Sequence, residues 1–326
     1  MVTNKRRVMV PSNMGREGVD ILRAREDIEV VSYPATITQA DLLPLLADAA
    51  GIALSATPYR QTEMDASPAM QVVARIGVGF DSVEIPALSA RGIPLMTTGV
   101  ANSTSVAEQA VFFIMAIAKR VAALDALVKE GRWQDRMKTI PSQLAGKTAL
   151  VVGFGRIGSR SAKRLAALEM TTLVYDPHVP PETIRALGYE VVTDLDAALP
   201  RADYVTIHCP KSPATIDLFD AARLAKMKKG AGLVNTARGG IVNEPALHAA
   251  LVSGHLAGAG LDVFDMEPTP MANSLLKLDT VLAAPHVAGV TVESIVLMAM
   301  ATAENILSAL DGKPNADNVV NKEVLE

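Results

Sequence analysis

Short runs of β-branched residues alternate with Ala- and Leu-rich helical segments along the whole chain. This alternation is typical of a parallel sheet covered by helices, because each parallel strand needs a crossover connection to its neighbour. The series starts twice. The expected strands are 7–10, 29–33, 51–54 and 72–76 in the first series, and 148–152, 171–175, 204–208, 232–235, 260–263 and 281–283 in the second. The pattern predicts an α/β protein with two Rossmann-like, doubly wound parallel-sheet domains.

Three helical segments stand out in the same pattern. Segment 38–50 begins at Thr38, a residue suited to an N-cap. Segment 103–121 is apolar on more than one face, so we expect a core helix that links the domains, a dimer helix, or both. Segment 291–311 is expected to be the final helix, with its methionines used for packing.

Composition excludes several classes of protein. A formal net charge of −4 offers no field for nucleic acid or an anionic membrane. The N-terminal apolar run is too short for a signal peptide, and no uncharged stretch approaches the roughly 20 residues of a membrane span. The single cysteine, Cys209, fits a reducing compartment. We therefore expect a cytoplasmic protein with neither nucleic-acid nor membrane partners, and we expect no metal site.

A glycine loop, LVVGFGRIGSR, follows directly from an expected strand and opens a helix. Gly153 permits the tight turn, Gly155 lets backbone N–H groups reach a pyrophosphate, and Gly158 lets the helix approach the sheet. Asp176 ends the next strand, where an acid can accept the ribose hydroxyls and repel a 2′-phosphate. The combination favours NAD over NADP, with Arg156 flanking the pyrophosphate.

Three polar side chains each follow an expected strand of the second series. They are Arg238 in VNTARGG, Glu267 in LDVFDMEP and His286 in APHVAG. The carboxyl ends of parallel strands converge on the ligand crevice, so distance along the chain does not prevent contact. An imidazolium can donate the proton when a keto acid is reduced, a carboxylate can fix its tautomer, and a guanidinium can bind the substrate carboxylate. Taken singly, each residue also suits a structural role.

Taken together, these blocks resemble the D-isomer-specific 2-hydroxyacid dehydrogenase family. The resemblance also covers RIGVGFDSVEIPALSARGI at 75–93, NSTSVAEQA at 102–110 and ADYVTIHCP at 202–210. It implies that Arg238, Glu267 and His286 are the catalytic trio and that backbone groups of Val78 and Gly79 hold the substrate carboxylate. The cofactor-binding residues that we expect are Gly153, Gly155, Arg156, Ile157, Gly158, Asp176, His208, Cys209, Pro210, Thr236, Ala237, Asp262 and Gly289.

The resemblance also implies a split arrangement of domains. Residues 1–101 and 290–326 would form a discontinuous, flavodoxin-like substrate domain, and residues 102–289 the NAD-binding domain. The helix at 103–121 would form a homodimer. The chain ends at Glu326, so we expect no regulatory domain after it.

Within the family, the blocks are most similar to the 3-phosphoglycerate dehydrogenase branch. Leu54 stands where that branch usually has a phosphate-binding arginine, so Arg60 and Arg75 are the candidate replacements. Glyoxylate or hydroxypyruvate reduction is the alternative activity, and a non-catalytic NAD-sensing regulator is a more remote one.

Overall fold

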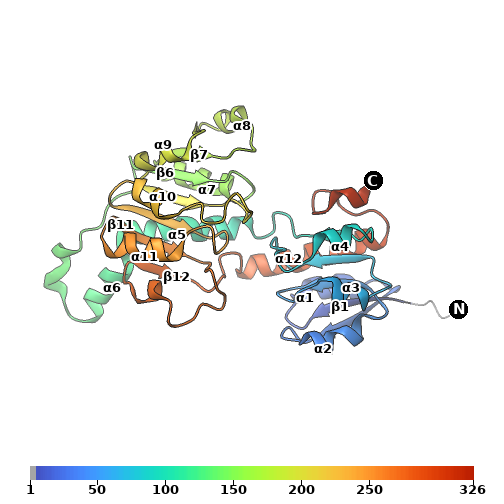
Figure 1. Ribbon diagram of the computed structural model, residues 1–326. Helices are drawn as coiled ribbons and strands as arrows, with labels where there is room; N and C mark the ends of the chain where they lie inside the picture. Colours follow the sequence, from blue (N-terminus) through green and yellow to red (C-terminus); the bar gives the residue numbers. More distant parts are fainter. Residues whose placement is uncertain (1–4) are drawn as a thin grey trace. The chain divides into compact units, whose positions relative to one another are not determined.

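The computed structural model describes residues 5–326, which divide into two compact units. Within the described residues, unit 1 consists of 5–102 and 290–326, and unit 2 consists of 103–289. Each unit is built on its own parallel sheet (Figure 1). The α/β architecture with two parallel sheets is confirmed.

Unit 1 contains a five-stranded sheet in the order β2-β1-β3-β4-β5, with every neighbouring pair parallel. This is the flavodoxin-like strand order. Its strands are β1 Arg6–Pro11, β2 Ile28–Tyr33, β3 Ala49–Leu54, β4 Val72–Arg75 and β5 Leu95–Met96. Its α-helices are α1 Arg16–Arg23, α2 Gln39–Leu42, α3 Gln61–Asp65, α4 Ile85–Ser89 and α12 Val292–Leu310, with 3-10 turns η1 Leu43–Leu46 and η5 Lys322–Leu325.

Helix α12 is long and apolar enough to span a membrane by length and composition. Its buried side, which includes Met298, Ala299, Ala303 and Ile306, packs on α1, β3 and β4. The core helix of a globular unit meets the same criterion, and these contacts account for the buried apolar residues of α12.

Unit 2 contains a seven-stranded sheet in the order β12-β11-β10-β9-β6-β7-β8. Counted from β6, this is the doubly wound dinucleotide-binding order 3-2-1-4-5-6 with one more strand at the edge. Its strands are β6 Thr148–Val152, β7 Thr171–Tyr175, β8 Glu190–Val191, β9 Tyr204–Ile207, β10 Ala231–Asn235, β11 Leu256–Leu261 and β12 Val281–Ala283. Its helices are α5 Ser103–Lys119, α6 Val121–Lys129, α7 Gly158–Ala167, α8 Pro181–Ala186, α9 Leu195–Ala198, α10 Ala221–Lys226 and α11 Glu244–Val252, with 3-10 turns η2 Trp133–Lys138, η3 Leu199–Arg201 and η4 Ser274–Lys277.

Two apolar clusters cover the two faces of this sheet. Residues of α5 and α7 share one cluster with Val151 and Val234, whereas α10 and α11 share the other with Val152 and Leu233. Successive strand residues thus point to opposite faces, as a sheet buried on both sides requires. In Figure 1, α5 and α11 lie on the two sides of this sheet.

Several expected elements differ in the structure. The helix expected over 38–50 stops after Leu46. Ala49 and Ala50 already belong to β3, where both side chains are buried in the sheet. Thr38 does cap α2, since its hydroxyl accepts from Asp41 N. The helix expected over 103–121 ends at Lys119, and Arg120, at φ 52°, separates it from α6.

Strand boundaries also differ. The strand expected at 260–263 is β11, which begins at Leu256 and ends at Leu261. The short strands β5 and β8 were not expected, because two residues are too few for a periodic pattern.

Candidate active site and cofactor site

The glycine loop between β6 and α7 has the geometry that its sequence requires. Gly153 has φ +93°, and a Cβ there would lie 2.6 Å from Cys209 N, so only glycine fits. A Cβ on Gly158 would lie 1.9 Å from Gly153 O, which shows how closely α7 approaches the turn. Nothing lies within 4 Å of a Cβ built on Gly155, so the backbone there is open to a ligand. The loop therefore fits a pyrophosphate at the N-terminus of α7.

Asp176 follows β7 and holds this loop in place. Its Oδ2 accepts from Phe154 N at 2.7 Å, and its Oδ1 accepts from His178 N at 2.8 Å and Val179 N at 3.1 Å. An ionised carboxylate has about four acceptor positions, so one remains for a ribose hydroxyl. The side chain thus joins the glycine loop to the position expected for the adenosine ribose.

Buried polar atoms follow β9 and β10. His208 Nδ1 and Thr236 Oγ1 are buried and have no hydrogen-bond partner among residues 5–326. His208 Nε2 lies 3.0 Å from Thr206 Oγ1, and burial lowers the pKa of His208 to about 3, so its ring is neutral. Buried polar atoms normally have partners, so these two fit a polar ligand such as the carboxamide of a nicotinamide.

Cys209 lies beside the glycine loop and is partly buried. Burial raises the pKa of its thiol to about 11, so the group is not a thiolate at neutral pH. A neutral thiol is a poor nucleophile, and the residue is suited to the role of a small wall residue.

His286 and Glu267 form a hydrogen-bonded pair. Nδ1 of His286 lies 2.7 Å from Oε2 of Glu267, and Oε1 of Glu267 accepts from Phe264 N at 2.9 Å. The carboxylate is therefore held at both oxygens and fixes the orientation of the ring. The His286 side chain is 47% exposed, so a substrate can reach the ring. The geometry leaves Nε2 to exchange a proton with a substrate.

Asp262, at the end of β11, anchors the segment that carries this histidine. Its Oδ1 accepts from Val287 N at 2.8 Å, its Oδ2 from Ala288 N at 2.9 Å, and its carbonyl from His286 N at 2.8 Å. Burial raises the pKa of Asp262, and its two amide donors act in the opposite direction. His286 has φ +54°, which is costly for a residue other than glycine. These three hydrogen bonds stabilise that conformation.

Arg238 follows β10, the strand next to β11. Its Nη1 donates to Ala237 O at 2.6 Å, and its carbonyl accepts from Asn235 Nδ2 at 2.9 Å. A Cβ on the following Gly239 would lie 1.8 Å from Phe264 O, so the loop after Arg238 lies directly on the segment that leads to Glu267. Because β10, β11 and β12 are neighbours, the three candidate catalytic side chains follow adjacent carboxyl ends.

The remaining expected cofactor residues also lie in unit 2. Arg156 and Ile157 belong to the glycine loop, Pro210 and Ala237 follow β9 and β10, and Gly289 ends the His286 segment.

The expected substrate residues lie in unit 1. Arg75 ends β4, and its Nε donates to Gly79 O at 2.7 Å, so it supports the Val78–Gly79 turn. Arg60 precedes α3, and its backbone N–H donates to Glu63 Oε2 at 2.8 Å. The Arg60 side chain is exposed.

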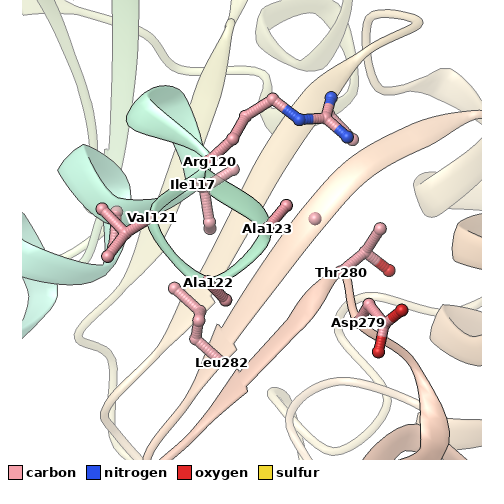
Figure 2. A pocket seen from close by; sticks show the side chains of 11 residues that line it. Ile117, Arg120, Val121, Ala122, Ala123, Asp279, Thr280 and Leu282 are labelled. Carbon is pink, nitrogen blue, oxygen red and sulfur yellow. The ribbon is translucent and has the colours of Figure 1, made fainter. Parts of the chain in front are cut away.

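A cavity of about 50 Å³ lies elsewhere in unit 2, at the end of the sheet where β11 and β12 begin (Figure 2). It is lined by the junction of α5 and α6, including Arg120, and by Asp279 and Thr280 before β12. It is too small for a dinucleotide and lies at the edge opposite the strand ends that carry the polar groups. Among residues 5–326, no group of three or more His, Cys, Asp or Glu side chains is arranged to hold a metal ion.

Sequence reasoning missed the residues that support the site. Glu244 Oε1 accepts from Asp265 N at 2.7 Å, and Asp265 Oδ1 accepts from Gly240 N at 2.7 Å, so the loops after β10 and β11 are tied together. The anchoring role of Asp262 was also missed. An acidic residue directly after the apolar strand segment GAGL was the available signal.

The doubly wound sheet, its glycine loop, the acid after β7 and the polar strand ends define a dinucleotide-binding domain of the dehydrogenase class. Residues 111–288 match the model of the D-isomer specific 2-hydroxyacid dehydrogenase family, NAD binding domain. The chain belongs to this family, which confirms the resemblance seen in the sequence, and the residues that match its NAD-binding domain lie within unit 2.

Individual relatives agree with this result. D-3-phosphoglycerate dehydrogenase of Archaeoglobus fulgidus is 37% identical over 98% of this chain and 60% of that protein, so the chain spans little more than half of its length. Glyoxylate reductase of Thermofilum pendens is 41% identical over 81% of this chain and 78% of that protein. The crystal structure of the TT0316 protein from Thermus thermophilus matches with a TM-score of 0.88, at 33% identity, over 96% of this chain and 99% of that one.

Proposed function

We propose that the chain is an NAD-dependent D-2-hydroxyacid dehydrogenase that interconverts a 2-keto acid and its 2-hydroxy acid. The observation that carries the proposal is the His286–Glu267 pair at 2.7 Å, in the NAD-binding domain of a family with this chemistry. NADH, when bound, would supply the hydride for C2 of the keto acid. The chain's own residues hold the substrate and move the proton.

The roles of the side chains follow from their geometry. In reduction, protonated His286 gives the proton on Nε2 to the carbonyl oxygen, while Glu267 keeps the ring in place through Nδ1. The Arg238 guanidinium binds the C1 carboxylate and stabilises negative charge that develops on the carbonyl oxygen. The family resemblance makes backbone groups of Val78 and Gly79, in unit 1, further candidates for carboxylate binding. Oxidation of the hydroxy acid runs through the same groups in reverse.

3-Phosphoglycerate is the substrate that we favour, since D-3-phosphoglycerate dehydrogenases match nearly all of this chain. Arg60 and Arg75 are our candidates for its phosphate, in place of the arginine replaced by Leu54. Reduction of glyoxylate or hydroxypyruvate is the second candidate, favoured by the 41% identity to a glyoxylate reductase. Turnover of 3-phosphoglycerate with NAD, measured beside turnover of hydroxypyruvate and glyoxylate with NADH, separates the two. Activity on the unphosphorylated acids alone would refute the first choice.

We also propose that the protein is a cytoplasmic homodimer. Helix α5 exposes Phe112 and Met115, and the segment that follows exposes Val121, Val128 and Trp133. An exposed apolar surface of this kind is typical of an interface. Sedimentation velocity measures the assembly state directly.

The catalytic role of His286 is tested by substitution with glutamine. We expect His286→Gln to lower kcat by about 10²–10⁴-fold, the range for a lost general acid, with the Kd for NADH within about twofold of wild type. His248→Gln, a change in the middle of helix α11, is the matched control and should leave kcat unaltered. Equal kcat in wild type and His286→Gln would disprove the assigned role.

A further inference from the structure

Lys211 follows the carboxyl end of β9, and its side chain lies against the loop after β10. A Cβ built on Gly240 would lie 2.8 Å from Nζ and 3.1 Å from Cε of Lys211. β9 and β10 are adjacent and parallel, so both segments leave the same edge of the sheet. Arg238, the candidate for binding the substrate carboxylate, lies two residues before Gly240. The ammonium group is therefore placed at the edge that carries the candidate active site.

Both segments at this contact are held by hydrogen bonds. Thr215 Oγ1 donates to Pro210 O at 2.7 Å and accepts from Ser212 N at 2.7 Å, so the backbone is fixed on both sides of Lys211. Gly240 is fixed as well, because its carbonyl accepts from Asp217 N at 2.8 Å and its N–H donates to a carboxylate. The lysine is thus presented from a rigid turn.

The charge of Lys211 is not neutralised by an ion pair within residues 5–326. Two carboxylates lie near the same glycine, but each has another partner. Asp265 accepts the Gly240 N–H, and Asp217 accepts from Asn243 Nδ2 at 3.1 Å. Lys211 is also exposed, so its ammonium can meet a ligand anion.

We propose that Lys211 is a specificity-determining residue that selects 2-keto acids with a second anionic group at the end remote from C1. The inference rests on the proposed function and names its substrate class. Arg238 offers a planar fork suited to the C1 carboxylate, whereas an ammonium is a compact point charge with rotatable donors. Such a group binds a phosphate or a second carboxylate, and these two anions are distinguished by the test.

The test compares three keto acids with NADH: hydroxypyruvate, its 3-phosphate ester, and 2-oxoglutarate. The first has a neutral end, the second a phosphate and the third a second carboxylate. We expect Lys211→Met to lower kcat/KM about ten- to hundredfold for at least one anionic-ended substrate, the range for a lost charge-assisted contact. Hydroxypyruvate should change by less than about twofold. Loss on the phosphate ester alone, or on 2-oxoglutarate alone, supports the proposal and identifies the anion.

Two further variants complete the experiment. Lys229→Met removes an exposed lysine from the opposite, amino-terminal end of β10 and should leave all three kcat/KM values unchanged. Lys211→Arg keeps the charge and should retain most of the selectivity. A uniform loss on all three substrates in Lys211→Met, or no loss on any, overturns the proposal. Those results leave the dehydrogenase function standing, whereas a wild-type protein that binds NADH and reduces neither these three acids nor glyoxylate refutes both.

Discussion

Replacing Asp262 with asparagine tests the most specific structural argument about the site. The Asp262 side chain is 1% exposed and receives two backbone N–H groups, from Val287 and Ala288, one on each oxygen. Asparagine has the same shape but only one acceptor oxygen. Its NH₂ group would therefore face one of these N–H donors in a buried place, and the His286 segment would lose a support for its left-handed conformation.

The magnitude follows from that single exchange. Loss of a hydrogen bond to a charged acceptor costs about 1.5–3 kcal/mol. For a unit of this size, each kcal/mol shifts the Tm by about 2–4 °C, so Asp262→Asn should lower the Tm of unit 2 by about 3–12 °C. A shift of the ring by about 1 Å would lower kcat by about 10²-fold.

Differential scanning calorimetry and steady-state kinetics measure both effects. Asp279→Asn is the matched control, because Asp279 is exposed at the opposite edge of the same sheet (Figure 2), and it should change stability by less than about 0.5 kcal/mol. If Asp262→Asn has the Tm and kcat of wild type, the support that the Asp262 carboxylate gives to Val287 N and Ala288 N is not required and the reasoning is wrong.

Two more predictions concern the cofactor side. Asp176→Ala should weaken NADH binding about ten- to hundredfold and reduce discrimination against NADPH, because it removes a ribose acceptor and the support of Phe154 N. Fluorescence titration with both nucleotides measures these effects. An unchanged preference for NADH would contradict the prediction. His208 is neutral in the folded protein, with its pKa lowered to about 3, so acidification below its unfolded pKa of about 6.5 favours unfolding, by about 2 kcal/mol at pH 5. Urea unfolding of the apo-protein at pH 7.5 and pH 5 should show this decrease in the free energy of unfolding in wild type, and a smaller decrease in His208→Gln. Equal decreases in the two proteins would show that another group is responsible.

The fold was predictable because its signals are local. Buried runs of four to six residues between helical segments identify parallel strands, and the glycine spacing at 153–158 identifies the turn that opens α7. The predictions were wrong where a segment satisfies two patterns. Ala49 and Ala50 suit a helix by propensity, but the sheet of unit 1 takes them into β3. Arg120 carries no helix-breaking signal, yet its backbone adopts a left-handed conformation between α5 and α6.

The candidate site was predictable as a set of residues but not as an arrangement. The blocks around Arg238, Glu267 and His286 could be found by their position after strands. Their supports could not, because Asp262, Glu244 and their partners act through hydrogen bonds between segments about 20 or more residues apart. Sequence position also says little about which histidine is neutral, since burial decides it for His208.

By itself the sequence determined the parallel α/β architecture, the nucleotide loop and the family, since hydrophobic periodicity and glycine spacing are encoded in contiguous residues. The pairing of Glu267 with His286 was expected from the sequence, whereas the tertiary structure alone decided that Asp262 holds the backbone of the His286 segment and that Lys211 lies against Gly240. The physical reason is that strand order places the ends of β9, β10, β11 and β12 side by side. Hydrogen bonding, burial and charge at that edge arise only from this convergence.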